Sequence, residues 1–294
     1  FPPAVLLFFV ANVFQLRIAL MYTALVIPVL LLVLFFSLYY AVTLRNRVDV
    51  ALSEMEKPTM RDVLSVIIAI GVIAAIPLSI VTGIATLSEA AGIGVFGGLV
   101  VMAFRGRMTF ARLNKTIVQT ASMTSMVFFI VVGASIFSLG FNLIDGREVL
   151  LAWINGFDLG RWMTLALLLG IILALGFVFD WIEILLVFLP ILLPVFGQLD
   201  FSDHVGSDYF SKIWLAGLIA LALQTSFLSP PFGYALFFAK MAAPPGVNLA
   251  DIYRGAGPLV IIEILLIAVL AWWPKLITWL PELVLSRSDS PLLN

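Results

Sequence analysis

The sequence predicts an all-α, polytopic membrane protein. Of its 294 residues, 63% are hydrophobic and 11% are charged, whereas soluble domains are about 45–50% apolar and about 25% charged. The mean hydropathy is +1.16. Several apolar runs approach the roughly 20 residues that a helix needs to cross the hydrocarbon layer. A membrane barrel would instead show short segments of alternating hydrophobicity, so we expect a bundle of membrane helices.

The composition also excludes several kinds of chemistry. A net charge of −1 does not provide the basic surface that nucleic-acid binding requires, so we expect no nucleic-acid partner. The chain contains no cysteine and one histidine, His204, which excludes disulfides, cysteine chemistry and a His-rich metal site. It opens with Phe1-Pro2-Pro3, which resembles the interior of an element, and we expect an N-terminal portion to be missing from it.

Ordinary membrane spans are expected at residues 20–42, 62–82 and 255–273. The charged segment 45–61 is expected in the cytoplasm, because positively charged loops favour that side. Residues 105–119 have one apolar and one charged face, which is typical of a helix lying along the membrane interface. The expected organisation is the end of a first repeat (1–43), a cytoplasmic linker (44–61), scaffold spans with an interfacial arm helix (62–121), a second-repeat transport region (122–240), and a final span with a tail (241–294).

The glycine-rich segment 83–98 predicts a closely packed helix. Ser88 is a candidate helix cap, with Glu89 in the favourable first turn. An intramembrane carboxylate could handle ions, but its position at a helix start favours a capping role for Glu89. The residues that would give the helix a smooth packing surface are Ala90, Ala91, Gly94, Gly97 and Gly98.

Residues 213–238 are apolar at both ends but cannot form one continuous helix. Pro230 and Pro231 lack amide hydrogens and clash with the preceding turn, and Gly233 loosens the backbone further. Main-chain groups freed at membrane depth must be satisfied by protein, water or an ion. Such a break is typical of ion and substrate sites in transporters, although a tolerated proline kink is the alternative. The hydroxyl groups beside the break belong to Thr225, Ser226 and Ser229.

Asp180 separates two apolar runs, residues 162–179 and 181–196, each short for a full span. The pattern fits either one crossing that unwinds around residues 176–180 or a helical hairpin. Glu183 follows three residues later and can share a helical face with Asp180. Because carboxylates are expensive at membrane depth, we interpret Asp180 as functional, whereas an interfacial position suits Glu183 equally well.

A further apolar run, residues 122–141, contains Gly133-Ala134-Ser135 near its centre. The run is either one span with a seam of small residues or the first limb of a re-entrant hairpin whose tip is formed by these three residues. Its length does not choose between the two.

The start of the chain resembles its end. Residues 1–11 align with residues 229–239 at one offset, so that Pro2-Pro3 matches Pro230-Pro231. Corresponding broken helices in two halves indicate an inverted-repeat transporter. On this interpretation, Pro2 and Pro3 lie in the broken helix of the first half.

Four stretches, taken in order, resemble the large membrane subunit of tripartite ATP-independent periplasmic (TRAP) transporters. Before its paired prolines that family usually has Thr, and Ser229 in this position keeps a hydroxyl group. The four stretches are Phe1-Pro2-Pro3, residues 83–91 (GIATLSEAA), residues 130–138 (IVVGASIFS), and the segment from Phe179-Asp180 to Thr225–Gly233, which ends in TSFLSPPFG.

The resemblance implies an inverted-repeat ion-transporter fold with a re-entrant hairpin and discontinuous helices. It implies inward sodium coupling, no cofactor besides sodium ions, and an organic acid or related small polar solute as cargo. The implied partners are a small integral membrane subunit, a periplasmic solute-binding protein and the lipid bilayer of the bacterial inner membrane. By position, the second hairpin would cover residues 122–150 with its tip at 133–135, and Asp180 would mark the unwound crossing that faces it.

Ion-coupled alternating access is the mechanism that fits these residues. Freed carbonyls and hydroxyls would bind sodium, and half-helix N-termini would hold a substrate carboxylate, since few basic residues lie at depth. The candidate sodium- and substrate-binding residues are Gly133, Ala134, Ser135, Asp180, Thr225, Ser226, Ser229, Pro230, Pro231 and Gly233, with Pro2 and Pro3 in the first half.

Three alternatives accompany this interpretation. Another ion-coupled carboxylate carrier, or an uncoupled channel or exporter, could share the same inverted-repeat fold. An intramembrane enzyme would use Asp180 and Glu183 as an acid–base pair, but no Gly-x-Asp protease signature, metal-ligand cluster or nucleophile–base pair accompanies them, so we expect no enzyme. A purely structural subunit would explain every break as a kink.

Overall fold

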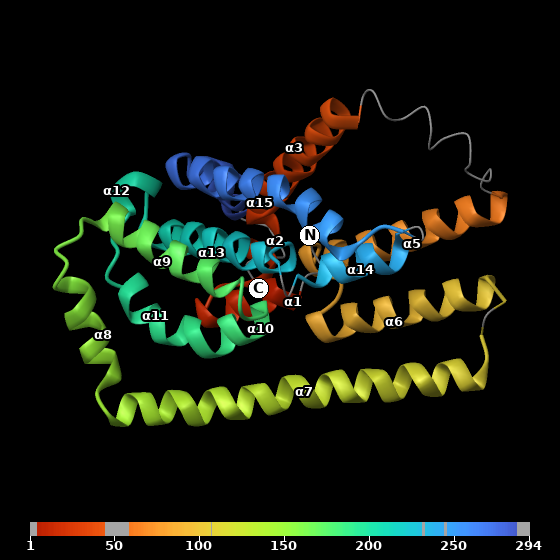
Figure 1. Ribbon diagram of the computed structural model, residues 1–294, viewed down its shortest axis with the longest axis horizontal. Coiled ribbons are helices and arrows are strands. Elements are labelled where there is room, and N and C mark those ends of the chain that lie inside the picture. Colours follow the sequence, from red (N-terminus) through yellow and green to blue (C-terminus); the bar gives the residue numbers. More distant parts are fainter. Residues whose placement is uncertain (1–4, 45–58, 107, 231–232, 244–245, 287–294) are drawn as a thin grey trace.

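The computed structural model describes residues 5–44, 59–106, 108–230, 233–243 and 246–286, and over these ranges it is helical without β-strands (Figure 1). Pro2, Pro3, Pro231 and most of the charged segment 45–61 lie outside the described residues. In chain order the elements are α1 (Val5–Val13), α2 (Ile18–Ala24), α3 (Val26–Leu44), α5 (Met60–Val81), α6 (Leu87–Phe104), α7 (Phe110–Leu143), α8 (Gly146–Asn155), α9 (Arg161–Leu175), α10 (Trp181–Glu183), the π-helical turn η1 (Ile184–Phe188), α11 (Leu189–Phe196), α12 (Ser202–Val205), α13 (Asp208–Gln224), the 3₁₀ turn η2 (Thr225–Phe227), α14 (Tyr234–Ala242), α15 (Leu249–Trp272) and α16 (Lys275–Ser286).

Several of these helices are suited to a bilayer. Four helical segments of the described chain are long and apolar enough to cross a membrane, namely residues 18–43, 110–143, 208–227 and 249–272. The predicted all-α polytopic membrane protein is therefore confirmed. The division into domains and the inverted repeat stay predictions, although α1 and α14, which follow the two proline pairs, are both nine residues long.

Helix α13 forms the centre of the bundle. Helices α1, α2, α9, α15 and α16 all pack against it (Figure 1), and every residue from Ile213 to Leu223 is buried. Within this core the Trp214 indole donates to the main-chain oxygen of Leu270 at 2.9 Å, so its polar atom is satisfied. This burial places the end of α13, where the chain breaks, inside the protein.

Helices α9 and α10–α11 form a hairpin (Figure 1). The chain leaves α9 at Gly176 and re-enters a helix at Trp181, and the loop after α11 returns to the start of α9, where Arg161 pairs with Asp203. The structure thus selects the hairpin from the two alternatives predicted around Asp180. Both limbs are only about 22–24 Å long at 1.5 Å per residue, which is less than the hydrocarbon thickness of about 30 Å.

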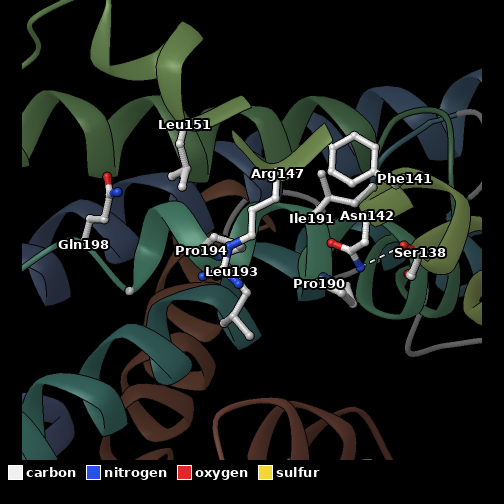
Figure 2. A pocket seen from close by; sticks show the side chains of 11 residues that line it. Ser138, Phe141, Asn142, Arg147, Leu151, Pro190, Ile191, Leu193, Pro194 and Gln198 are labelled. Atoms are coloured by element: carbon white, nitrogen blue, oxygen red, sulfur yellow. Dashed lines mark hydrogen bonds between the residues drawn. The ribbon is translucent and has the colours of Figure 1, made fainter. Parts of the chain in front are cut away.

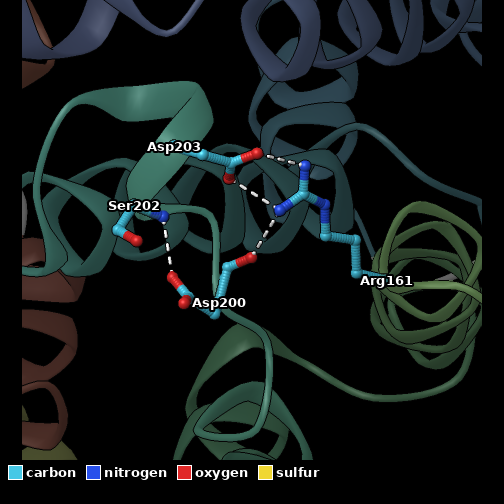
Figure 3. Close-up of polar contacts among 4 residues, drawn as sticks. All are labelled: Arg161, Asp200, Ser202 and Asp203. Carbon is cyan, nitrogen blue, oxygen red and sulfur yellow. Dashed lines mark hydrogen bonds and ion pairs between the residues drawn. The ribbon is translucent and has the colours of Figure 1, made fainter.

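Arg161 closes the open end of this hairpin (Figure 3). Its guanidinium donates to the two carboxylate oxygens of Asp203 at 2.6 and 2.7 Å and to the main-chain oxygen of Asp200 at 3.0 Å. The Asp200 carboxylate accepts from the Ser202 amide at 2.8 Å. Hydrogen bonding to Arg161 lowers the pKa of Asp203. The positive charge of Arg161, at the start of α9, therefore balances the negative charge of Asp203 in the loop after α11.

Helix α7 is continuous over 34 residues, about 50 Å at the normal rise. The sequence predicted an interfacial helix ending near Gln119 and offered a hairpin tip at Gly133–Ser135, and the structure corrects both because α7 runs through them. The Ser135 hydroxyl donates to the Val131 carbonyl at 2.7 Å, a bond typical of a hydroxyl inside a helix. A lone glycine costs a helix only about 1 kcal/mol, so nothing here forces a break. The chain turns later, at Asp145, whose φ is +54°.

The start of α6 is a capping box, with Thr86 rather than the predicted Ser88 as the cap. The Glu89 carboxylate accepts from the Thr86 amide at 2.7 Å, and the Glu89 amide donates to the Thr86 hydroxyl at 3.4 Å. These reciprocal bonds satisfy amides that have no partner within the helix. The predicted capping role of Glu89 is confirmed.

The predicted glycine surface of α6 lies against α5. A Cβ atom built on Gly97 would lie 2.4 Å from Cγ1 of Val72, and one on Gly94 would lie 3.0 Å from Cδ1 of Ile76. Gly98 meets no atom within 4 Å among the described residues. The close approach of the two helices therefore depends on Gly97 and Gly94 and not on Gly98.

We expect Gly97→Ala to destabilise the α5–α6 pair by about 1–3 kcal/mol, because the added methyl group overpacks against the stiff Val72 side chain. The matched variant Gly98→Ala adds the same methyl group to open space and should be neutral or stabilising by up to about 1 kcal/mol. Thermal unfolding of the purified protein in detergent measures both. Equal midpoints for the two variants would contradict this packing.

Candidate functional site

The helix predicted to break near Pro230 does break. Helix α13 ends at Gln224, tightens into η2, and the chain resumes a helix only at Tyr234. Pro230 cannot donate to the Ser226 carbonyl, nor Pro231 to that of Phe227, as a continuing helix would require. The two carbonyls are thus left without their helical donors.

Gly233 closes this break. Its amide donates to the Ser229 carbonyl at 2.9 Å, and a Cβ atom at this position would lie 2.6 Å from the main-chain oxygen of Phe227. Because that contact is too short for a carbon atom, the turn requires glycine. The sequence predicted Gly233 as a loosening residue, and the structure shows that close backbone approach is the reason for it.

Three buried hydroxyl groups line the break. Thr225, Ser226 and Ser229 are 1%, 3% and 1% exposed. They donate to the carbonyls of Ala222 at 2.6 Å, Leu223 at 2.7 Å and Thr225 at 2.8 Å, respectively. Each hydroxyl donates its hydrogen to a main-chain carbonyl. Its oxygen keeps lone pairs, which can accept a hydrogen bond or bind a cation.

Asp180 lies at the second break, which is the bend of the hairpin. It occupies the N-cap position of α10 with extended backbone angles, φ −75° and ψ 161°, and its main-chain oxygen accepts from the Ile184 amide at 3.1 Å. The side chain is half-buried. A carboxylate at this position faces the positive end of the helix dipole.

The two breaks are in contact. A Cβ atom on Gly176 would lie 3.3 Å from Cβ of Ser226, and the rings of Trp181 and Phe227 stack with centroids 6.2 Å apart and planes at 20°. The Phe9 ring of α1 lies 6.4 Å from that of Trp181. The structure therefore brings the Asp180 segment, the hydroxyl-bearing break and the helix that follows Pro2-Pro3 into one region.

The predicted residues on α7 are placed differently. Gly133 and Ser135 are exposed, whereas Ala134 is 6% exposed, and α7 packs along η1. All three lie inside a regular helix, where carbonyls accept from amides four residues later. Their role in binding stays a prediction.

Sequence reasoning gave no function to the three residues that join the breaks, or to Glu263 of α15. Gly176, Trp181 and Phe227 make the contacts between the breaks, and no periodicity distinguishes them from ordinary core residues. Glu263, within α15, is fully buried, and neither of its carboxylate oxygens has a hydrogen-bond partner among the described residues. One oxygen of Glu183, for which the sequence favoured a functional and an interfacial role equally, is in the same state. A lone carboxylate within an apolar span is the signal that points to Glu263.

The oxygen atoms of the two breaks suit a hard monovalent cation. Over the part of the chain that the structure describes, no three His, Cys, Asp or Glu residues come together in a way that could hold a metal ion. The two breaks instead offer hydroxyls, freed carbonyls and one carboxylate. These are the ligands that unwound helices use for sodium in transporters.

Two helix breaks in contact, lined by buried hydroxyl groups in a polytopic helical bundle, are typical of membrane transport proteins with discontinuous helices. The sequence profile of the family described as the tripartite ATP-independent periplasmic transporter, DctM component, matches residues 1–276. The chain belongs to this family, as the resemblance predicted.

The names of three relatives agree with this assignment. The chain is 22% identical over 195 residues to a putative TRAP transporter large permease protein of Haemophilus influenzae, covering 66% of this chain and 46% of the relative. It is 24% identical over 207 residues to the C4-dicarboxylate TRAP transporter large permease protein DctM of Rhodobacter capsulatus, covering 70% and 41%. It is 27% identical over 214 residues to the sialic acid TRAP transporter large permease protein SiaM of Vibrio cholerae, covering 70% and 46%. The aligned part is thus less than half of each of these relatives.

We expect Gly233→Ala to push the Phe227 carbonyl out of place and to lower the stability of the folded protein by about 1–3 kcal/mol, as overpacking does. Gly255→Ala is the matched control, because a Cβ atom there meets nothing within 4 Å among the described residues. Thermal unfolding in detergent distinguishes them. A Gly233→Ala midpoint equal to that of the control would show that the turn does not need glycine.

Proposed function

We propose that the chain forms part of the large permease subunit of a sodium-coupled secondary transporter that imports an organic acid or a related small polar solute. The observation that carries the proposal is the contact between the two breaks, at Gly176 and Ser226, beside three buried hydroxyl groups. Membership of the DctM family supports the transport role. Two of the relatives are a C4-dicarboxylate permease and a sialic acid permease, which supports an acid as the cargo.

The mechanism begins with sodium at the two breaks. The hydroxyl oxygens of Thr225, Ser226 and Ser229, together with the freed carbonyl of Ser226, would coordinate the ion, and the Asp180 carboxylate would balance its charge. Binding would tie the hairpin bend to the end of α13. A cation that binds only this arrangement shifts the population toward it, which is how ion binding would be coupled to alternating access.

The remaining parts of the proposal follow from the family. A small integral membrane subunit and a periplasmic solute-binding protein would complete the system in the bacterial inner membrane, and the binding protein would deliver the solute. The function is transport rather than catalysis. An uncoupled channel or exporter is the alternative, and uptake that persists without a sodium gradient would favour it.

We expect Thr225→Ala and Ser226→Ala each to raise the sodium concentration needed for half-maximal solute uptake by about tenfold or more, since an oxygen contact to a charged group is worth about 1.5–3 kcal/mol. Uptake into proteoliposomes at varied sodium concentration measures this.

Ser79→Ala is the matched control for both variants. The Ser79 hydroxyl also donates to a carbonyl of its own helix, that of Ile76 at 2.8 Å, but it lies in α5 and belongs to neither break. An unchanged sodium dependence in the Thr225 and Ser226 variants, equal to that of the control, would count against these hydroxyls as ligands.

A further inference from the structure

A cavity of about 470 Å³ opens between the end of α7, the start of α8, and α11 (Figure 2). Its size is that of pockets that bind small molecules, roughly 300–1,000 Å³. It lies along the α11 limb of the hairpin, from Pro190 to Gln198, and none of the residues at the two breaks lines it. It is therefore separate from the candidate sodium site.

Arg147 is the charged residue among those that line the cavity. Its side chain extends from the start of α8 toward α11 (Figure 2). Across the described residues its guanidinium has neither an ion pair nor a hydrogen bond. The acidic neighbours Asp145 and Glu148 do not line the cavity. An arginine without a counter-ion, in a pocket without an acid, favours an anion as the occupant.

Amide side chains accompany Arg147. Asn142 donates through Nδ2 to the Ser138 carbonyl at 2.9 Å (Figure 2), which fixes its orientation and leaves its second N–H available. Gln198 lies at the other end of the lining and carries two further amide hydrogens. Donors at both ends of the cavity suit a solute with polar groups beyond its acid group.

The walls between these polar groups are apolar. Ile191, Leu193 and Pro194 of α11 and Leu151 of α8 contribute them. Arg147 is exposed and therefore accessible to a solute, and the planar fork of its guanidinium matches a carboxylate through two parallel hydrogen bonds. A few placed polar groups on an apolar lining are the usual composition of a small-molecule site.

We propose that this cavity binds the carboxylate group of the transported solute, with Arg147 as its ionic partner and the amides of Asn142 and Gln198 as further donors. The assignment rests on the proposed function, since it takes the occupant to be the cargo. It also revises an expectation from the sequence, which gave helix ends rather than an arginine the task of holding the anion. The phosphate of an anionic lipid is the other oxyanion that could reach Arg147 in a membrane.

The test uses the absence of cysteine from the chain. A single cysteine introduced as Gly197→Cys, which lines the cavity but is not one of the proposed donors, reports on the cavity through its rate of modification by a maleimide. The chain is expressed in membranes together with the products of its neighbouring genes and is placed in nanodiscs without a sodium gradient. Succinate and sialic acid are the solute probes, and Ala250→Cys, at the exposed start of α15, is the control.

We expect succinate or sialic acid to slow modification of Gly197→Cys but not of Ala250→Cys. Arg147→Gln should weaken this protection, with an apparent affinity about ten- to a hundredfold lower, because a hydrogen-bonded charge partner is lost. Arg147→Lys should restore part of it, since lysine keeps the charge without the fork. Arg254→Gln, at an exposed arginine of α15, should leave protection unchanged.

Two results would overturn the proposal. One is modification that neither acid slows in the protein that retains Arg147, a measurement that does not depend on whether the Arg147 variants fold. The other is protection by phosphatidylglycerol in the nanodisc, relative to phosphatidylcholine alone, without protection by either acid. The protection assay uses no gradient and is therefore independent of the uptake assay in proteoliposomes. If the solute is taken up with sodium but does not protect the cysteine, only this binding site is refuted. If the solute protects the cysteine but is not taken up with sodium, only the proposed sodium coupling is refuted.

Discussion

The structure depends on the requirement that main-chain hydrogen-bonding groups be satisfied when no water surrounds them. A proline removes one donor from a helix, and a proline pair at positions 230 and 231 removes two in succession. The break lies at the end of α13, which belongs to the most buried of the four candidate membrane spans, and the bend of the α9–α11 hairpin lies against it.

Residues with a local physical effect were predictable from the sequence. Pro230 and Gly233 act on the backbone wherever they stand, so the break between α13 and α14 follows from them. Glu89 caps a helix for equally local reasons. The short apolar runs on both sides of Asp180 limited that segment to two arrangements. Only the return of the chain to Arg161, an interaction between residues 42 positions apart, selects the hairpin.

Features that depend on neighbours in space were not predictable. Gly133-Ala134-Ser135 carries no proline, and small residues fit a continuous helix as well as a tip, so α7 could run on to Leu143. The contact of Gly176 with Ser226 joins elements whose packing no periodicity encodes. The cap of α6 was misplaced by two residues, from Thr86 to Ser88, because both side chains can cap and only the bond to Glu89 decides. Nothing in the sequence marks Arg147, because the cavity that it lines forms only where α7, α8 and α11 come together.

The central claim is that the two breaks meet to hold sodium, and a disulfide between Gly176→Cys and Ser226→Cys tests it most directly. A Cβ atom on Gly176 would lie 3.3 Å from that of Ser226, close to the usual disulfide separation of about 3.8 Å, and the chain has no cysteine of its own to compete. Because Ser226→Cys removes one of the proposed ligands, sodium is varied to about tenfold above the concentration that the unaltered protein needs. The account predicts rapid oxidation of this pair, at a rate that sodium in this range changes and potassium does not. Failure to form the cross-link, or identical rates in the two salts, would contradict it.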